Sequence, residues 1–140
     1  NKWRRLVKDV YAPIGKGGVS NTAPFCAGLW GGMSSAGCVE RIRTVEREDL
    51  PFDHYWMDAG WYGDGVKASP DEYEGDWAQH TGNWEINAVR HPDGLQDVVS
   101  EIAKGDKRFL LWFEPERVRP NTKLFGSPNA PIVIKRGEIV

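Results

Sequence analysis

Apolar residues in this sequence alternate between short unbroken runs and helical repeats. Three runs, at residues 25–30, 54–58 and 109–114, predict strands, and the unbroken first run is typical of a strand buried on both faces. The repeats between them predict two helices, whose apolar positions are Val39, Ile42 and Val45 in one and Leu95, Val98, Val99 and Ile102 in the other. A further helix is expected within residues 1–11, before Pro13.

This order of strands and helices predicts an α/β fold, in which helices cover a sheet of parallel strands. The chain has 140 residues, which are too few for a closed eight-unit β/α barrel of roughly 250 residues. We expect three regions: an N-terminal helix with a lead-in loop at 1–24, a β/α unit at 25–125 and a C-terminal tail at 126–140.

Composition argues against several function classes. The chain has 18 Lys and Arg against 20 Asp and Glu, so it lacks the positive charge that favours nucleic acid or an anionic membrane. No apolar run approaches the roughly 20 residues of a membrane helix. The charged residues 1–10 are unlike a signal peptide, which favours a cytoplasmic protein. The two cysteines lack zinc-ligand spacing, and we expect neither a metal nor a cofactor.

Aromatic and acidic residues gather at the expected strand ends. Side chains alternate along a strand, so every second residue lies on the same face. The residues that share a face are Cys26, Gly28 and Trp30 on the first expected strand, His54, Trp56 and Asp58 on the second, and Leu110, Trp112 and Glu114 on the third. Ligands bind at the carboxyl edge of parallel α/β sheets. Carboxylates accept hydrogen bonds from hydroxyls and indoles pack on sugar rings, so this edge predicts a pocket for a polyhydroxylated, uncharged ligand.

Structural interpretations exist for each of these residues. The three tryptophans at the strand ends could fill a barrel core, and Asp58 could cap a turn. We expect Glu116 rather than Glu114 to pair with Arg117 and Arg119. We expect His54 to be hydrogen-bonded in the core, and His80 and His91 to lie in loops. We expect Trp61 to lie in a sharply turning loop with Gly60, Gly63 and Gly65. A solvated face is expected of the acidic residues Asp64, Asp71, Glu72, Glu74 and Asp76.

Asp58 and Glu114 also suggest a catalytic pair. If their strands are neighbours, the two backbones lie about 5 Å apart, and retaining glycosidases place two carboxyl groups roughly 5–5.5 Å apart. Spacing alone therefore leaves a local catalytic pair open.

Four segments resemble glycoside hydrolase family 36, the bacterial α-galactosidase family. Residues 55–63 (YWMDAGWYG) are similar to its D-D-G-W strand end, residues 82–87 (GNWEIN) to its G-D-W-x-x-N segment, residues 91–95 (HPDGL) to F-P-x-G-L, and residues 111–118 (LWFEPERV) to L-W-F-E-P-E-M-V. The likeness spans about residues 25–124, in the family's order and spacing.

The resemblance implies a partial (β/α)8 barrel, of about three strands, from an enzyme that removes α-galactosyl units with retention. The family's nucleophile and acid/base lie on the fourth and sixth strands, so the matched segment implies no catalytic residue and no activity of the chain alone. Asp58 matches an acid that grips sugar hydroxyls, and Trp30 and Trp112 match residues lining the sugar subsite. Ala59 and Asn83 stand where the family has acids.

The expected sugar-binding residues are therefore Trp30, Asp58, Trp61, Trp112 and Glu114, and the expected partner is an α-galactoside or a related α-sugar. The implied function favours Asp58 as a binding residue over the local catalytic pair. Three alternatives remain: a non-catalytic carbohydrate-binding protein, a remnant of a barrel that self-associates, and a truncated gene product with no function of its own. The uncovered edges and apolar inner face of a three-stranded sheet favour a homo-oligomer.

Overall fold

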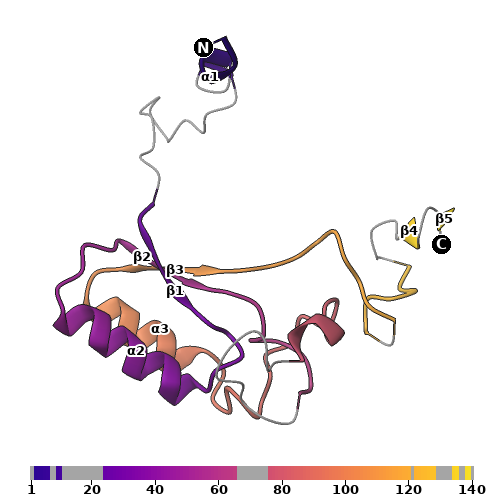
Figure 1. Ribbon diagram of the computed structural model, residues 1–140. Helices are drawn as coiled ribbons and strands as arrows, with labels where there is room; N and C mark the ends of the chain where they lie inside the picture. Colours follow the sequence, from indigo (N-terminus) through magenta and orange to yellow (C-terminus); the bar gives the residue numbers. More distant parts are fainter. Residues whose placement is uncertain are drawn as a thin grey trace.

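The computed structural model describes residues 2–6, 9–10, 24–65, 76–120, 122–128, 134–135 and 138–139. In chain order the elements are α1 (Lys2–Leu6), β1 (Cys26–Leu29), α2 (Ser35–Arg47), β2 (His54–Met57), the 3₁₀ helix η2 (Trp77–Gln79), α3 (Gln96–Lys104), β3 (Arg108–Leu111), β4 (Ile134–Lys135) and β5 (Glu138–Ile139) (Figure 1). Helix α1 covers five of the residues 1–11 in which a helix was expected, while Val7 lies outside the described residues. No helix in the described part of the chain has the length and apolar character needed to cross a membrane.

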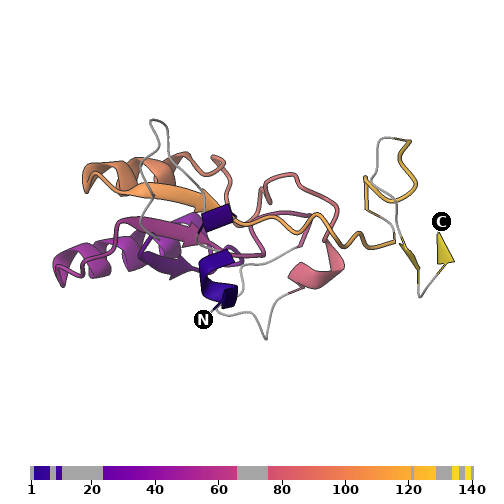
Figure 2. The ribbon, with the colours of Figure 1, turned by 90° about the horizontal axis from the view of Figure 1, so that it is seen from above.

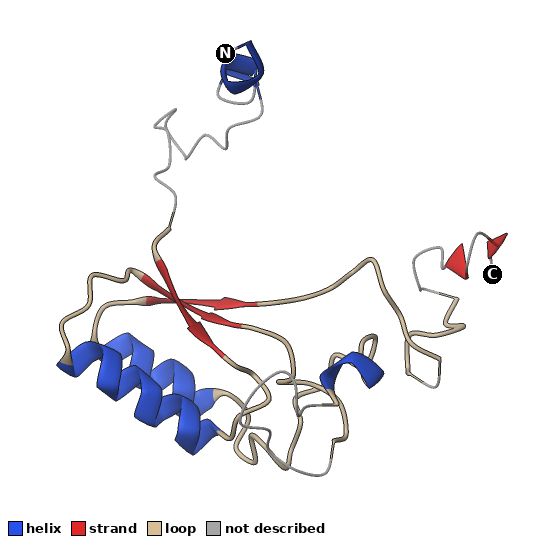
Figure 3. Ribbon diagram, viewed as in Figure 1, coloured by secondary structure: helices blue, strands red, loops and turns tan. Residues whose placement is uncertain are grey.

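Strands β1, β2 and β3 form one sheet in that order, and both pairs run parallel (Figure 3). Gly28 lies opposite Trp56, and Trp56 lies opposite Leu110, so side chains of equal parity share a face across all three strands. This arrangement confirms the predicted α/β fold with a parallel sheet.

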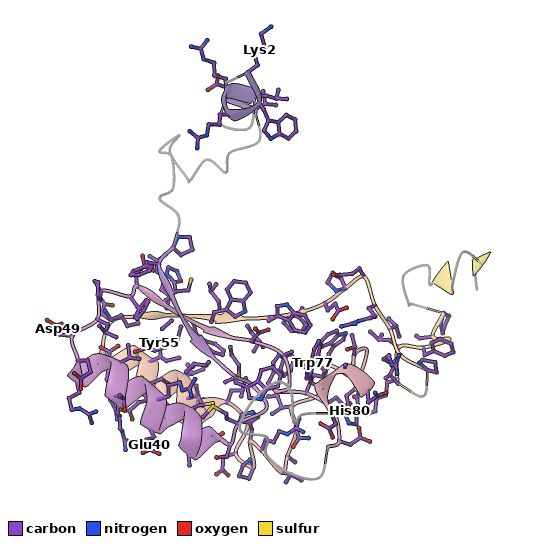
Figure 4. All side chains as sticks on the ribbon, viewed as in Figure 1. Lys2, Glu40, Asp49, Tyr55, Trp77 and His80 are labelled. Carbon is purple, nitrogen blue, oxygen red and sulfur yellow. The ribbon has the colours of Figure 1, made fainter. Side chains whose placement is uncertain are left out.

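Helices α2 and α3 lie side by side against one face of this sheet (Figures 1 and 2). Helix α2 begins where the Ser34 side chain accepts a hydrogen bond from the Gly37 amide at 3.2 Å. Tyr55, between the sheet and α2 in Figure 4, is fully buried and donates its hydroxyl to Glu46 Oε1 at 2.6 Å. The other fully buried side chains of this core include Leu29 and Met57 from the strands, Cys38 and Ile42 from α2, and Val98 and Ile102 from α3.

The opposite face of the sheet is exposed, so the prediction of a first strand buried on both faces is wrong. Gly28 is exposed, and the side chains of Trp56 and Leu110 are 44 % and 38 % exposed. Helices α2 and α3 both lie on the other face (Figure 1). The apolar run of β1 indicates that this face is suited to burial, but the described residues do not cover it. In a closed β/α barrel the same face points into the barrel interior.

The turns after β1 and β2 touch through their backbones. A Cβ atom added at Gly31 would lie 2.5 Å from the carbonyl oxygen of Asp58 and 2.8 Å from that of Ala59. Because the obstacles are backbone atoms, which cannot rotate away, only glycine fits at this position. The two strand ends are consequently fixed at close range.

We expect Gly31→Ala to lower the free energy of unfolding by about 2 kcal/mol or more, because the new methyl group overpacks two carbonyl groups. The matched control is Gly28→Ala, since a Cβ at Gly28 would meet nothing within 4 Å; its effect should stay within about 0.5 kcal/mol. Urea unfolding followed by circular dichroism measures both. Equal stability of the two variants would contradict the backbone contact.

Candidate functional site

Three predicted site residues lie level with one another at the carboxyl edge of the sheet. The pairing of Gly28 with Trp56 and of Trp56 with Leu110 continues past the strand ends, where the Asp58 amide donates to Leu29 O at 2.8 Å and the Trp112 amide donates to Met57 O at 2.9 Å. The next residues on the same face are Trp30, Asp58 and Trp112. The register therefore places one indole on each side of the Asp58 carboxylate.

Asp58 presents its carboxylate at the surface. The residue is exposed, its Oδ1 accepts a hydrogen bond from the Ala59 amide at 2.7 Å, and the described part of the chain supplies no ion-pair partner for it. The bond to the adjacent amide fixes the carboxylate beside the turn. Its remaining acceptor positions suit the hydroxyl groups of a sugar.

Glu114 is engaged by an arginine, against expectation. It is 8 % exposed and forms an ion pair with Arg117, in which Nη2 donates to Oε2 at 2.6 Å and Nε contacts Oε1. We expected Glu116 to pair with Arg117, but the turn at Pro115 and Glu116 brings residues three apart together instead. The two-pronged contact is typical of a guanidinium that holds a carboxylate in place.

The same register makes the predicted adjacency of Asp58 and Glu114 wrong. Trp112, not Glu114, lies beside Asp58, and Glu114 comes two residues farther along the chain. The carboxyl group of Glu114 is already bound to Arg117. The arrangement does not supply the two facing carboxyl groups of a local catalytic pair.

Aromatic rings form a continuous cluster behind and beside these strand ends. We call it the aromatic cluster; it consists of Trp30, Trp61, Tyr62, Trp77, Trp84, Trp112 and Phe113. Trp61 is only 2 % exposed, and its Nε1 donates to the Trp112 carbonyl oxygen at 3.0 Å. Tyr62 is fully buried with its ring stacked on Trp112 at 6.3 Å, and burial raises its pKa to about 12. Trp61 and Tyr62 therefore support Trp112 from within the molecule.

Trp77 is a site residue that reasoning from the sequence missed. It lies on η2, which Figure 2 shows beyond the carboxyl ends of the strands, and it is labelled in Figure 4. Its ring makes edge contacts with Trp30 at 6.4 Å and Trp112 at 6.1 Å, and the Arg117 guanidinium lies 5.5 Å from its centroid. The segment around Trp77 has no apolar periodicity; the only available signal was the excess of tryptophan in polar surroundings.

The three histidines have different surroundings. His54 is hydrogen-bonded as expected, with Nδ1 2.6 Å from Asp53 Oδ1, but it is half-buried and is not part of the core. His80 on the η2 loop lies between Asp64 and Asp76, at 3.0 and 3.3 Å. His91 lies in a loop, as predicted.

His91 is nevertheless buried, at 1 % exposure. Its Nδ1 is 2.8 Å from Ser35 Oγ and its Nε2 is 3.0 Å from Gly31 O. Burial lowers its pKa, an effect opposed by the bond to Gly31 and reinforced by the charge of Arg90.

No cluster of three His, Cys, Asp or Glu side chains suited to a metal ion occurs among the residues that the structure describes. Asp71, Glu72 and Glu74 of the acidic loop lie outside those residues, and Asp64 is exposed. The polar groups at the site are a carboxylate, which accepts hydrogen bonds, and indole and guanidinium groups, which donate them; these suit hydrogen bonding and stacking with a sugar.

Comparison with known proteins gives a family match. Residues 38–135 match the Melibiase family model. Alpha-galactosidase 2 of Hypocrea jecorina is 34 % identical over 87 residues, which are 57 % of this chain and 11 % of that protein. Alpha-galactosidase AgaA of Geobacillus stearothermophilus is 28 % identical over 111 residues, which are 72 % of this chain and 14 % of that protein. The chain spans about a tenth of the length of the curated relatives it matches.

Solved structures show the same likeness. A variant of GH36 alpha-galactosidase AgaA from Geobacillus stearothermophilus, in complex with 1-deoxygalactonojirimycin, matches with a TM-score of 0.58 at 25 % identity, over 84 % of this chain and 17 % of that chain. AgaB from the same organism matches with a TM-score of 0.58 at 24 % identity and supports the fold alone. The three parallel strands with their helices thus correspond to part of a TIM barrel, as predicted.

We expect Arg117→Met to cost about 1–2 kcal/mol of folding free energy at neutral pH, because it leaves the Glu114 carboxylate buried without its charged donor. Arg119→Met is the matched control: Arg119 is exposed and donates to Gln79 at 2.7 Å, so its loss should cost less than about 0.5 kcal/mol. Urea unfolding compares the two variants. An Arg117→Met protein as stable as the control would contradict the structural importance of the ion pair.

Proposed function

The chain belongs to the melibiase family, that of the GH36 α-galactosidases, and we propose that it supplies part of the sugar-binding site of a retaining α-glycosidase barrel. The alignment of Trp30, Asp58 and Trp112 at one level of a parallel sheet carries this proposal. In this view residues 25–125 are the barrel portion, flanked by a lead-in at 1–24 and a tail at 126–140. The substrate is an α-galactoside or a related α-sugar.

Each residue has a distinct part in the proposed site. Asp58 accepts hydrogen bonds from sugar hydroxyls, and the rings of Trp30 and Trp112 form the walls against which the apolar face of the sugar packs. Trp61 and Glu114 act from behind, because Trp61 is buried beneath Trp112 and Glu114 is bound to Arg117. The complexes of AgaA variants with stachyose and raffinose support an α-galactoside as the ligand class.

We propose that this chain binds sugar without cleaving it. Retention needs a nucleophile and an acid/base about 5–5.5 Å apart, whereas Asp58 lies level with Trp112 and the Glu114 carboxylate is bound to Arg117. Orientation of a bound sugar assists catalysis, whereas bond cleavage requires groups that Asp58 and Glu114 do not supply. In this proposal those groups lie on later barrel strands, as the resemblance to the family implies.

We expect the 140-residue chain to bind methyl α-galactoside with a millimolar dissociation constant and Asp58→Asn to weaken binding about tenfold, through loss of a charged acceptor. Asp106→Asn is the matched control, because Asp106 is exposed and its positive φ suits Asn. Isothermal titration calorimetry measures all three proteins.

An aryl α-galactoside serves as the activity substrate, and no turnover is expected. Turnover that is abolished by both Asp58→Asn and Glu114→Gln would overturn the binding-only role. Absence of saturable binding in the unmodified chain would overturn the proposed sugar site.

A second candidate function, self-association of the chain, is favoured by the exposed face of the sheet. Trp56 and Leu110 are partly exposed on it, and β1 and β3 are both edge strands of the same parallel sheet. The β3 edge of one copy can therefore pair in parallel with the β1 edge of the next. In a barrel-like sheet built from several copies this face would turn inward, so further copies of this chain are the proposed occupants that bury it.

We expect light scattering at micromolar concentration to give an average mass above the 15.8 kDa of one chain, and Trp56→Lys to lower it toward that value because a charge opposes burial of this face. Leu50→Lys is the control, since Leu50 has the same 44 % exposure in a loop away from the sheet face. A monodisperse monomer of the unmodified chain would contradict self-association.

A further inference from the structure

Two consecutive residues, Arg90 and His91, join the turns that carry Trp30 and Asp58. His91 Nε2 lies 3.0 Å from the carbonyl oxygen of Gly31, the residue directly after Trp30. Arg90 Nη1 donates at 2.8 Å to the carbonyl oxygen of the glycine two residues after Asp58. One short segment thus holds both strand ends through their backbones.

We propose that Arg90 and His91 are positioning residues for the sugar site, and that His91 performs this role in its neutral form. The inference rests on the proposed function, because it concerns how Trp30 and Asp58 are held toward one sugar. Neither residue needs to touch the ligand: both are at most 2 % exposed. They act through the glycine carbonyl groups that they bind.

The hydrogen bonds of His91 define its protonation state. A carbonyl oxygen only accepts, so Nε2 carries the proton that it donates to Gly31. In the neutral ring Nδ1 then accepts from the Ser35 hydroxyl at 2.8 Å. A second proton, on Nδ1, would remove that acceptor and add a buried positive charge beside Arg90. The Nε2 bond to Gly31 is kept in the protonated ring, so protonation is expected to loosen the bridge through the contact with Ser35 and through repulsion between the charged ring and Arg90.

The groups that face the His91 ring are few. They are the Ser35 hydroxyl from α2, the Gly31 carbonyl from the turn after β1, and the Arg90 cation from its own segment. The pKa of His91 is lowered, chiefly by burial, from the ordinary value of 6.5. Its stabilising contribution is thus present above that value and lost as the pH falls through the lower folded-state pKa.

Arg90 is held as firmly as His91. Its Nη2 is 2.5 Å from Asp76 Oδ1, and the Arg90 carbonyl oxygen accepts from the Ser35 amide at 3.0 Å. Burial raises the pKa of Asp76, but the hydrogen bond and charge of Arg90 outweigh it and lower the net value. The guanidinium therefore bridges an ionised carboxylate and the Gly60 carbonyl oxygen.

The two glycine turns transmit their position to Trp30 by direct packing. A Cβ atom added at Gly60 would lie 2.7 Å from the Gly32 nitrogen and 3.3 Å from Trp30 Cζ2, and one added at Gly32 would lie 2.6 Å from Trp30 Nε1. Because there is no spare room, a shift of either turn moves the indole. The position of Trp30 should therefore follow the state of His91.

The test is an NMR titration of the full chain with methyl α-galactoside at about pH 7.5 and about pH 5, a range in which histidines titrate. The sugar is uncharged, so its own protonation does not enter. His91→Gln keeps one donor and one acceptor but does not titrate, and His91→Leu keeps neither. His54→Gln, at the opposite end of the sheet, is the control.

We expect the unmodified chain and His54→Gln to bind the sugar about threefold more weakly at the lower pH, because protonation of His91 becomes more favourable as the pH falls. His91→Gln should bind equally at both values, and His91→Leu should bind weakly at both. A His91→Gln variant with the pH profile of the unmodified chain, or a His91→Leu variant with full affinity, would overturn the proposal.

The indole Nε1–H resonance of Trp30, assigned through Trp30→Phe, tests the inference without sugar. We expect it to shift with pH in step with the His91 ring resonances and to stay fixed in His91→Gln. If the unmodified chain binds no sugar, the proposed function is wrong. The pH dependence of the Trp30 resonance still tests whether the state of His91 changes the position of Trp30. A Trp30 resonance that does not change with pH would overturn the inference on its own.

Discussion

The parallel register of β1, β2 and β3 is the constraint on which the site depends. It places Trp30, Asp58 and Trp112 at one level and on one face, although more than 25 residues separate each from the next in the chain. A shift of one residue in either strand pair would turn the corresponding side chain to the opposite face of the sheet. The helices α2 and α3 fix the register, because they bury the alternate residues, such as Leu29 and Met57.

The loops beyond the strands hold the strand ends of the proposed sugar site in fixed positions. Gly31 packs against the backbone that follows Asp58, and Arg90 and His91 bind glycine carbonyl groups on both turns. The aromatic cluster fills the space behind Trp112. These contacts hold Trp30, Asp58 and Trp112 in place. Fixed side chains are what the orientation of a bound sugar requires.

The sequence was sufficient to predict the three strands of the parallel sheet, the two main helices, their order and the position of Trp30, Asp58 and Trp112, because apolar periodicity and strand parity are local properties; it did not predict β4 and β5. It did not predict the ion pair of Glu114 with Arg117, since that depends on the turn at Pro115, nor the buried role of Trp61. Trp77 was missed because its contacts link a loop without periodicity to distant strands. The exposure of Trp56 was missed for a different reason. An apolar run indicates that a strand is suited to burial, but it does not indicate which part of the molecule covers the strand.

The central claim is that Trp30, Asp58 and Trp112 bind a single sugar. A crystal structure of the chain with methyl α-galactoside tests it most directly. The account predicts a sugar ring packed on Trp30 or Trp112, with at least one hydroxyl within hydrogen-bond distance of the Asp58 carboxylate. A sugar bound elsewhere, for example on Trp56 at the exposed face of the sheet, with Asp58 unoccupied, would contradict it.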